Sequence, residues 1–269
     1  AATGSDYLVT LRPGPAGSPP LILLPSDFGD LLIYANLVPL LDPGRACLGL
    51  QCPELYRDDQ GIRSMADLAE RFVHALRAVQ PRGPYLLAGH CYGGYVAMEM
   101  AKQLAAAGER IGLLALLDAR PCAPVAERGQ LWLMYLRSAL RAGRADWLRH
   151  LRARVNQHLQ ARRLDRLIRR DPGQLDPRLR NRWLLDQRTL VGYRSTPYDD
   201  RLTYIYPAGS RHELYDDPSC GWLHLAARLD LHRVPGTHLD MMKEPHVREL
   251  AACLQSCIVR AEETHGAAS

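Results

Sequence analysis

Short runs of consecutive apolar residues recur along the first half of the chain. Four of them lie at 19–25 (PPLILLP), 46–52 (ACLGLQC), 84–89 (PYLLAG) and 111–119 (IGLLALLDA). A strand that is apolar at almost every position is buried on both faces, which is typical of a parallel sheet covered by helices. The pattern therefore predicts a parallel sheet at the centre of the fold.

Amphipathic segments separate these runs and predict helices. In residues 64–79, Ser64 and Asp67 have the spacing of a helix-capping pair. The apolar stripe of this helix consists of Leu68, Phe72 and Leu76. A second helix is expected over 95–108, ending at Gly108. Strands that alternate with helices indicate an α/β fold, with a mostly parallel sheet and helices on both faces.

The pattern changes in the middle of the chain. Between Gln130 and Arg170, leucines and tryptophans recur at three- and four-residue steps among many arginines. This periodicity predicts helices without intervening strands. We therefore expect residues 122–198 to form a helical insertion in the sheet fold.

Strand and turn patterns return after the insertion. Residues 201–209 and 229–236 are predicted strands, and a closing helix is expected over 245–263. The predicted domain organisation is thus an α/β core formed by residues 1–121 and 199–269, interrupted by the helical insertion at 122–198.

The composition is that of a globular enzyme. The 269 residues are 47% hydrophobic and 23% charged, and no apolar run approaches the roughly 18 residues that span a bilayer. The first 20 residues are rich in small residues and proline and lack the apolar region of a secretory signal, and the opening AATGS has the composition of a linker. Seven irregularly spaced cysteines argue against a disulfide framework. We therefore expect a cytoplasmic protein without membrane attachment.

Arginines are concentrated in the predicted insertion. Residues 121–200 contain seventeen arginines and no lysine against eight acidic residues, a balance of +9 in a chain of net charge +5, so the remainder carries −4. Such a concentration of arginines could bind an acidic protein partner or a nucleic acid. It could also be a helical face that is simply exposed to solvent. Aromatic residues do not alternate with the arginines and no nucleic-acid-binding motif occurs, so we expect no nucleic acid partner.

Cys253 and Cys257 are four residues apart in the expected closing helix. Two cysteines at this spacing can bind a metal ion from one helix face. The sequence contains no second pair with ligand spacing. We therefore interpret the two thiols as core-packing side chains and expect no metal site.

The segment GHCYGG, residues 89–94, lies between a predicted strand and a predicted helix. This is the context of the nucleophile elbow, the G-x-S-x-G turn that carries a nucleophile, with Cys91 in the serine position. The alternative is a cysteine that only packs in a tight turn. Small neighbours permit the strained turn and a helix N-terminus stabilises a thiolate, so we interpret Cys91 as a nucleophile. The backbone N–H of Tyr92 is then expected to stabilise an oxyanion.

A thiol nucleophile requires a base and an acid that orients this base. In this architecture they follow in the order nucleophile, acid, histidine. Asp118 ends the strand after the elbow, and His238 lies in the loop between the last strand and the last helix. We therefore predict Asp118 as the acid and His238 as the base. The alternatives are Asp240 for the acid and His232 or His246 for the base.

The second oxyanion donor is expected in the loop after the first core strand, LLPSDFGD. Its N–H groups would face the elbow from the neighbouring strand. We predict the backbone N–H of Asp27 as this donor, with Phe28 as the alternative.

Together, the motifs resemble the type I thioesterase domains of nonribosomal peptide and polyketide synthetases, within the α/β-hydrolase family. The resemblance runs along nearly the whole chain. It depends on four segments: ILLPSDFGDLLIYANLVPLL, LLAGHCYGGYVAMEMAKQL, LLALLDARPC and VPGTHLDMMKEPHV. It implies the α/β-hydrolase fold, a triad of Cys91, Asp118 and His238, and oxyanion donors at Tyr92 and Asp27.

The resemblance also implies the form of the substrate. An acyl or peptidyl chain would arrive as a thioester on the phosphopantetheine arm of a carrier protein, with no cofactor of the domain's own. The helical lid would shape the acyl pocket, and its arginines fit an anionic carrier and its phosphate linker.

Cysteine at position 91 departs from the serine that is usual in this family. An acyl group on sulfur is a thioester, which retains the activation of the carrier-bound substrate. The cysteine variant is similar to family members that close four-membered rings, so we expect release as a β-lactam or β-lactone. Hydrolysis or macrocyclisation with an incidental cysteine, a stand-alone editing thioesterase and a non-catalytic docking module are the alternatives.

Overall fold

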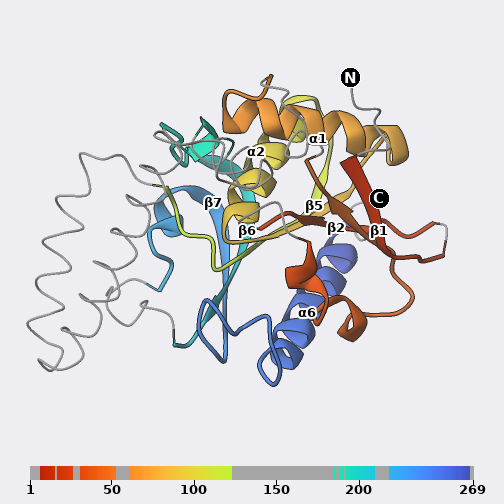
Figure 1. Cartoon of the computed structure of the whole chain (residues 1–269), viewed down its shortest axis with the longest axis vertical. Helices are drawn as coiled ribbons and strands as arrows, with labels where there is room; N and C mark the ends of the chain where they lie inside the picture. Colours follow the sequence, from red (N-terminus) through yellow and green to blue (C-terminus); the bar gives the residue numbers. More distant parts are fainter. Residues whose placement is uncertain are drawn as a thin grey trace, which may run out of the picture.

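The computed structural model describes residues 7–15, 17–26, 31–52, 61–122, 185, 188–190, 192–209 and 218–266. Within these residues, seven strands form one sheet in the order β1-β3-β2-β4-β5-β6-β7 (Figure 1). The strands are β1 (Leu8–Arg12), β2 (Leu21–Leu24), β3 (Cys47–Leu50), β4 (Tyr85–His90), β5 (Ile111–Leu117), β6 (Tyr198–Pro207) and β7 (Ala226–Val234). All neighbouring pairs are parallel except β1 and β3. The predicted α/β fold with a mostly parallel sheet is confirmed.

Helices cover both faces of this sheet (Figure 1). α1 (Met65–Val79) and α2 (Tyr92–Ala106) pack together on one face, and α6 (Val247–Gly266) packs on the other. Short 3-10 turns are η3 (Leu32–Tyr34), η4 (Val38–Leu40) and η9 (Trp222–His224). Each face of the sheet therefore has its own hydrophobic core.

The central strand β4 shows why an unbroken apolar run predicts a strand of this sheet. All six of its residues are buried. Leu87 belongs to the core beneath α1 and α2, whereas Leu86 and Ala88 belong to the core beneath α6. Successive side chains point to opposite faces, so covering both faces requires an unbroken apolar run.

The capping pair predicted for the first helix is also present. Ser64 Oγ accepts the backbone N–H of Asp67 at 3.1 Å, and Asp67 Oδ2 accepts the N–H of Ser64 at 3.1 Å. The predicted stripe of Leu68, Phe72 and Leu76 is buried. This helix is therefore fixed by both its cap and its apolar face.

Two elements differ from what the hydrophobic pattern alone predicts. β1 was not predicted, because it is an edge strand of intermediate exposure and lacks the pattern of a doubly buried strand. α2 begins at Tyr92, as the helix N-terminus expected beside Cys91 requires, although the amphipathic pattern starts only at residue 95, after Gly93 and Gly94.

Most of the predicted lid, residues 123–184, lies outside the described residues. The division into core and lid therefore stays a prediction. Among the helices that the structure describes, none combines the length and the apolar character that crossing a membrane requires.

Candidate active site

Cys91 occupies the sharp turn between β4 and α2. Its backbone has φ 52° and ψ −117°, a strained conformation for a residue with a side chain. The turn is held by two backbone hydrogen bonds: the N–H of Cys91 donates to Leu117 O at 3.1 Å, and the N–H of Gly94 donates to Cys91 O at 3.0 Å. The predicted elbow therefore has the local geometry that presents a side chain at the end of a strand.

Glycines allow this turn to form because backbones approach closely on both sides of it. A Cβ atom on Gly89 would lie 2.1 Å from the carbonyl oxygen of Gly93. A Cβ atom on Gly93 would lie 2.7 Å from the carbonyl oxygen of Leu24, at the end of β2. Both contacts are shorter than real Cβ atoms tolerate, so each position requires glycine.

The structure brings Asp118 and His238 together from positions 120 residues apart. His238 Nδ1 lies 2.7 Å from Asp118 Oδ2. An ionised carboxylate can only accept a hydrogen bond, so Nδ1 is the donor and Nε2 is the nitrogen available to act as a base. The side chain of Asp118 is fully buried, whereas 36% of the His238 side chain is exposed.

The position of Asp118 is fixed by its backbone and by a tyrosine. It follows β5 directly with φ 47°, and its N–H donates to Ile205 O at 2.8 Å. The buried Tyr204 hydroxyl lies 3.4 Å from the second carboxylate oxygen, Asp118 Oδ1. The carboxylate therefore has support from β6 in addition to its bond to His238.

His90 connects the elbow to His238. Its ring stacks on the His238 ring, with centroids 4.7 Å apart and an angle of 26° between the planes. His90 Nδ1 is hydrogen-bonded to Ser26 Oγ at 3.1 Å, and its backbone N–H donates to the Tyr34 hydroxyl at 3.0 Å. The stack therefore places the loop of His238 against the residue that directly precedes Cys91.

A comparison with protein families agrees with this arrangement. Residues 19–256 match the family model described as the thioesterase domain. The chain belongs to the thioesterase domain family. The match includes the elbow, Asp118 and His238.

Relatives of this thioesterase domain are much larger proteins. The probable nonribosomal peptide synthetase CymA of Salinispora arenicola is 37% identical over 125 residues, which are 46% of this chain and 2% of CymA. The non-reducing polyketide synthase atnG of Arthrinium sp is 28% identical over 269 residues, covering 92% of this chain and 13% of atnG. The chain thus spans a small fraction of the length of the curated relatives it matches.

Solved structures show the same fold. The NocB thioesterase domain, in covalent complex with a fluorophosphonate nocardicin G analog, is 26% identical with a TM-score of 0.63, over 95% of this chain and 99% of that one. A four-domain nonribosomal peptide synthetase matches with a TM-score of 0.68 and 21% identity, over 93% of this chain and 20% of the synthetase.

The alternative acid and bases have other places in the thioesterase domain. Asp240 Oδ1 accepts the backbone N–H of Thr237, and this hydrogen bond is the main reason why the pKa of Asp240 is lowered. His232 lies within β7, and His246 directly precedes α6. Of these groups, Asp118 and His238 are the pair that is hydrogen-bonded.

The predicted oxyanion donors are described only in part. Asp27 and Phe28 lie outside the described residues, although the preceding Ser26 is buried against His90. Tyr92 is buried in the first turn of α2, and its hydroxyl lies 2.8 Å from Thr189 Oγ1. The roles of the Tyr92 and Asp27 N–H groups stay predictions.

Sequence reasoning missed three supporting residues: Ser26, His90 and Tyr204. His90 had one available signal, because it directly precedes the candidate nucleophile. Ser26 and Tyr204 gave no local signal, since their roles depend on contacts with residues 64 and 86 positions away.

The burial of His90 predicts a pH-dependent stability. Desolvation, and next the charge of His238, lower the pKa of His90 from 6.5 to about 4. Between these pH values the unfolded chain binds more protons at this site than the folded domain. The free energy of unfolding should therefore fall by about 3 kcal/mol from this residue as the pH drops through the window.

Urea unfolding at several pH values, compared with His90→Gln, measures this contribution. The variant should lose less stability than the parent between pH 6.5 and 4. His74→Gln, at an exposed histidine of α1, should keep the parent's pH dependence. Parallel curves for the parent and His90→Gln would contradict the prediction.

Proposed function

We propose that this thioesterase domain takes an acyl or peptidyl group from a carrier protein onto Cys91 and then releases it, with His238 as the general base and Asp118 as the residue that orients it. The observation that carries the proposal is the 2.7 Å bond between His238 Nδ1 and Asp118 Oδ2. The bonded pair lies beside the elbow through the stack of His238 on His90.

In the loading step, His238 Nε2 removes the proton of the Cys91 thiol. The thiolate attacks the carbonyl carbon of the phosphopantetheine thioester and forms a tetrahedral oxyanion. Collapse of this intermediate breaks the bond to the pantetheine sulfur. The departing sulfur receives from His238 the proton that came from the Cys91 thiol. The backbone N–H groups of Tyr92 and Asp27 are the proposed oxyanion donors.

The release step depends on sulfur at position 91. An oxoester on serine is more strongly resonance-stabilised and has a poorer leaving group, so part of the carrier's activation is lost on loading. A thioester on Cys91 retains that activation. A strained four-membered ring needs it, because the free energy of ring strain must come from the acyl bond that is broken.

We therefore propose that the product is a β-lactam or β-lactone. A hydroxyl or amide N–H at the β-position of the bound substrate loses its proton to His238 and attacks the acyl carbon. The bond to Cys91 breaks, and the departing thiolate is reprotonated by His238. No atom is consumed from water, so cyclisation and hydrolysis give products that differ in mass by one water molecule.

The proposed partner is the carrier domain that delivers the substrate. The relatives named as synthetases and synthases support this, since this chain corresponds to a small part of each. The seventeen arginines between residues 121 and 200 would attract an acidic carrier surface and its phosphate. The phosphopantetheine arm belongs to that carrier, and the proposal assigns no cofactor to this domain.

The test is Cys91→Ser with a synthetic pantetheine thioester that carries a β-hydroxyl or β-amide nucleophile. The parent should release a cyclic product. The serine variant should still load substrate but stall as the acyl-enzyme or release free acid, because its oxoester lacks the required activation. Intact-protein and product mass spectrometry measure both results.

Two outcomes separate the parts of this proposal. Free acid from the parent would contradict ring closure while keeping the thioesterase reaction, and would favour hydrolytic release. Equal rates of cyclisation by the parent and Cys91→Ser would contradict the role given to sulfur. Cys122→Ser, at another half-buried thiol, is the control and should release the same product as the parent.

A further inference from the structure

Three metal-ligating side chains meet at the edge of the sheet, away from the elbow. They are His232 of β7 and Cys253 and Cys257 of α6, and one ligand atom of each lies within 4.8 Å of the others. β7 is the last strand in the sheet, whereas Cys91 follows the central strand β4. The cluster lies on the α6 face of the sheet and shares no residue with the candidate active site, although β7 leads into the loop of His238.

The fold produces this cluster from two simple periodicities. Residues two apart in β7 face the same side, so His232 points to the same face as Val234, which packs in the core beneath α6. Residues four apart lie on one side of a helix, so Cys253 and Cys257 both face that core, where Cys257 is buried and Cys253 is half-buried. The histidine is thus the third ligand that the sequence pattern alone lacks.

We propose that His232, Cys253 and Cys257 bind a Zn²⁺ ion. One imidazole and two thiolates form a ligand set typical of zinc, with a fourth position for water. Zinc ligands in a tetrahedral site lie about 2.0–2.3 Å from the ion, which places ligand atoms roughly 3.5–3.8 Å from one another. Side-chain rotations that shorten the distances between the ligand atoms by about 1 Å bring the cluster to that size. Binding then releases the two thiol protons.

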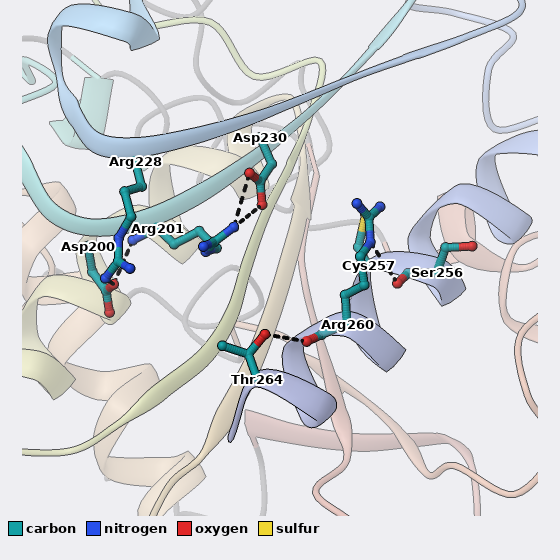
Figure 2. Close-up of polar contacts among 8 residues, drawn as sticks. All are labelled: Asp200, Arg201, Arg228, Asp230, Ser256, Cys257, Arg260 and Thr264. Carbon is teal, nitrogen blue, oxygen red and sulfur yellow. Dashed lines mark hydrogen bonds and ion pairs between the residues drawn. The ribbon is translucent and has the colours of Figure 1, made fainter. Parts of the chain in front are cut away.

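The charge of a bound Zn²⁺ ion would be balanced by the thiolates of the cluster itself. Two thiolates neutralise Zn²⁺ before any neighbour is counted. Arg260 is exposed, with Nη2 3.9 Å from Cys257 Sγ (Figure 2). Asp230 precedes His232 by two residues in β7, so the two residues face the same side of the sheet. Asp230 is held by Arg201 through contacts of 2.9 and 3.2 Å, so its carboxylate remains committed to that ion pair.

A zinc ion here would join an edge strand to the closing helix. α6 packs against β5 and β7 on the face opposite α1 and α2. Ligands from β7 and α6 would tie this contact together, since a bound ion stabilises only the folded arrangement. The effect inferred for the ion is to stabilise this contact between β7 and α6, and the inference stands independently of the reaction proposed for Cys91.

Zinc titration against a chromophoric chelator tests this site. The background is Cys91→Ala, which removes the thiol proposed as the nucleophile, so that this thiol cannot contribute to zinc binding. This protein should bind one Zn²⁺ per chain. Adding Cys253→Ser and Cys257→Ser should weaken binding by at least about 100-fold, more than the loss of an outer-shell partner. Adding Cys122→Ser instead should leave the affinity unchanged.

A second variant and a second readout keep the test decisive if the double cysteine variant folds poorly. His232→Gln removes one ligand at a half-buried strand position and should also weaken zinc binding. Co²⁺ should give thiolate charge-transfer absorption in the Cys91→Ala protein and not in the variant lacking Cys253 and Cys257. Failure of the Cys91→Ala protein to bind Zn²⁺, or binding unaffected by either set of ligand substitutions, would overturn the proposal.

Discussion

Replacing Cys91 with alanine is expected to abolish acyl loading. The alanine variant has no nucleophile to attack the carrier thioester, and turnover should fall by about 10⁶-fold, the scale seen when the nucleophile of a serine protease is removed. The fold should persist, because alanine has a Cβ atom as cysteine does and therefore adds no strain to the backbone conformation at φ 52°. Intact-protein mass spectrometry after incubation with a pantetheine thioester measures the acyl adduct directly.

A second thiol provides a matched control. Cys220 has nearly the same backbone angle, φ 53°, and is also of intermediate exposure. Cys220→Ala should therefore test the effect of losing a thiol at a strained position without removing the proposed nucleophile, although it also removes the contact of this thiol with the Tyr204 hydroxyl. It should still load substrate and react with iodoacetamide at Cys91. An acyl adduct on Cys91→Ala would contradict the assignment of the nucleophile.

Asp118→Asn is expected to lower turnover by about 10⁴-fold, as the corresponding change does in serine proteases. The amide has almost the shape of the carboxylate, so the buried site should be retained. Its NH₂ group, however, can donate to His238 Nδ1, which favours the tautomer with the proton on Nε2. That tautomer cannot remove a proton from Cys91. Steady-state rates with a pantetheine thioester measure the loss.

Asp240→Asn is the control for this prediction. Asp240 lies in the same loop as His238 but accepts the backbone N–H of Thr237, and an asparagine oxygen can accept the same bond. Its rate should stay within a few-fold of the parent. A loss as large as that of Asp118→Asn would contradict the assignment of Asp118 as the acid.

Features that depend only on residues close together in the sequence could be predicted. The doubly apolar strands, the Ser64 cap and the glycine-flanked turn at Cys91 are all visible in short windows, because burial and backbone strain there act locally. The positions of Asp118 and His238 followed from the rule that functional groups cluster at the carboxyl ends of parallel strands. The amphipathic pattern of helix α2 begins only at residue 95, because Gly93 and Gly94 in its first turn carry no apolar side chain.

Sequence by itself determined the α/β alternation, the elbow and the residue types offered for chemistry, because periodicity and turn sterics are written in consecutive positions. Only the tertiary structure decided which distant groups meet. The order and register of the strands bring His238 to Asp118, stack His90 on His238, and place His232 beside Cys253 and Cys257. Such contacts depend on how the sheet is assembled, and no local pattern specifies that assembly.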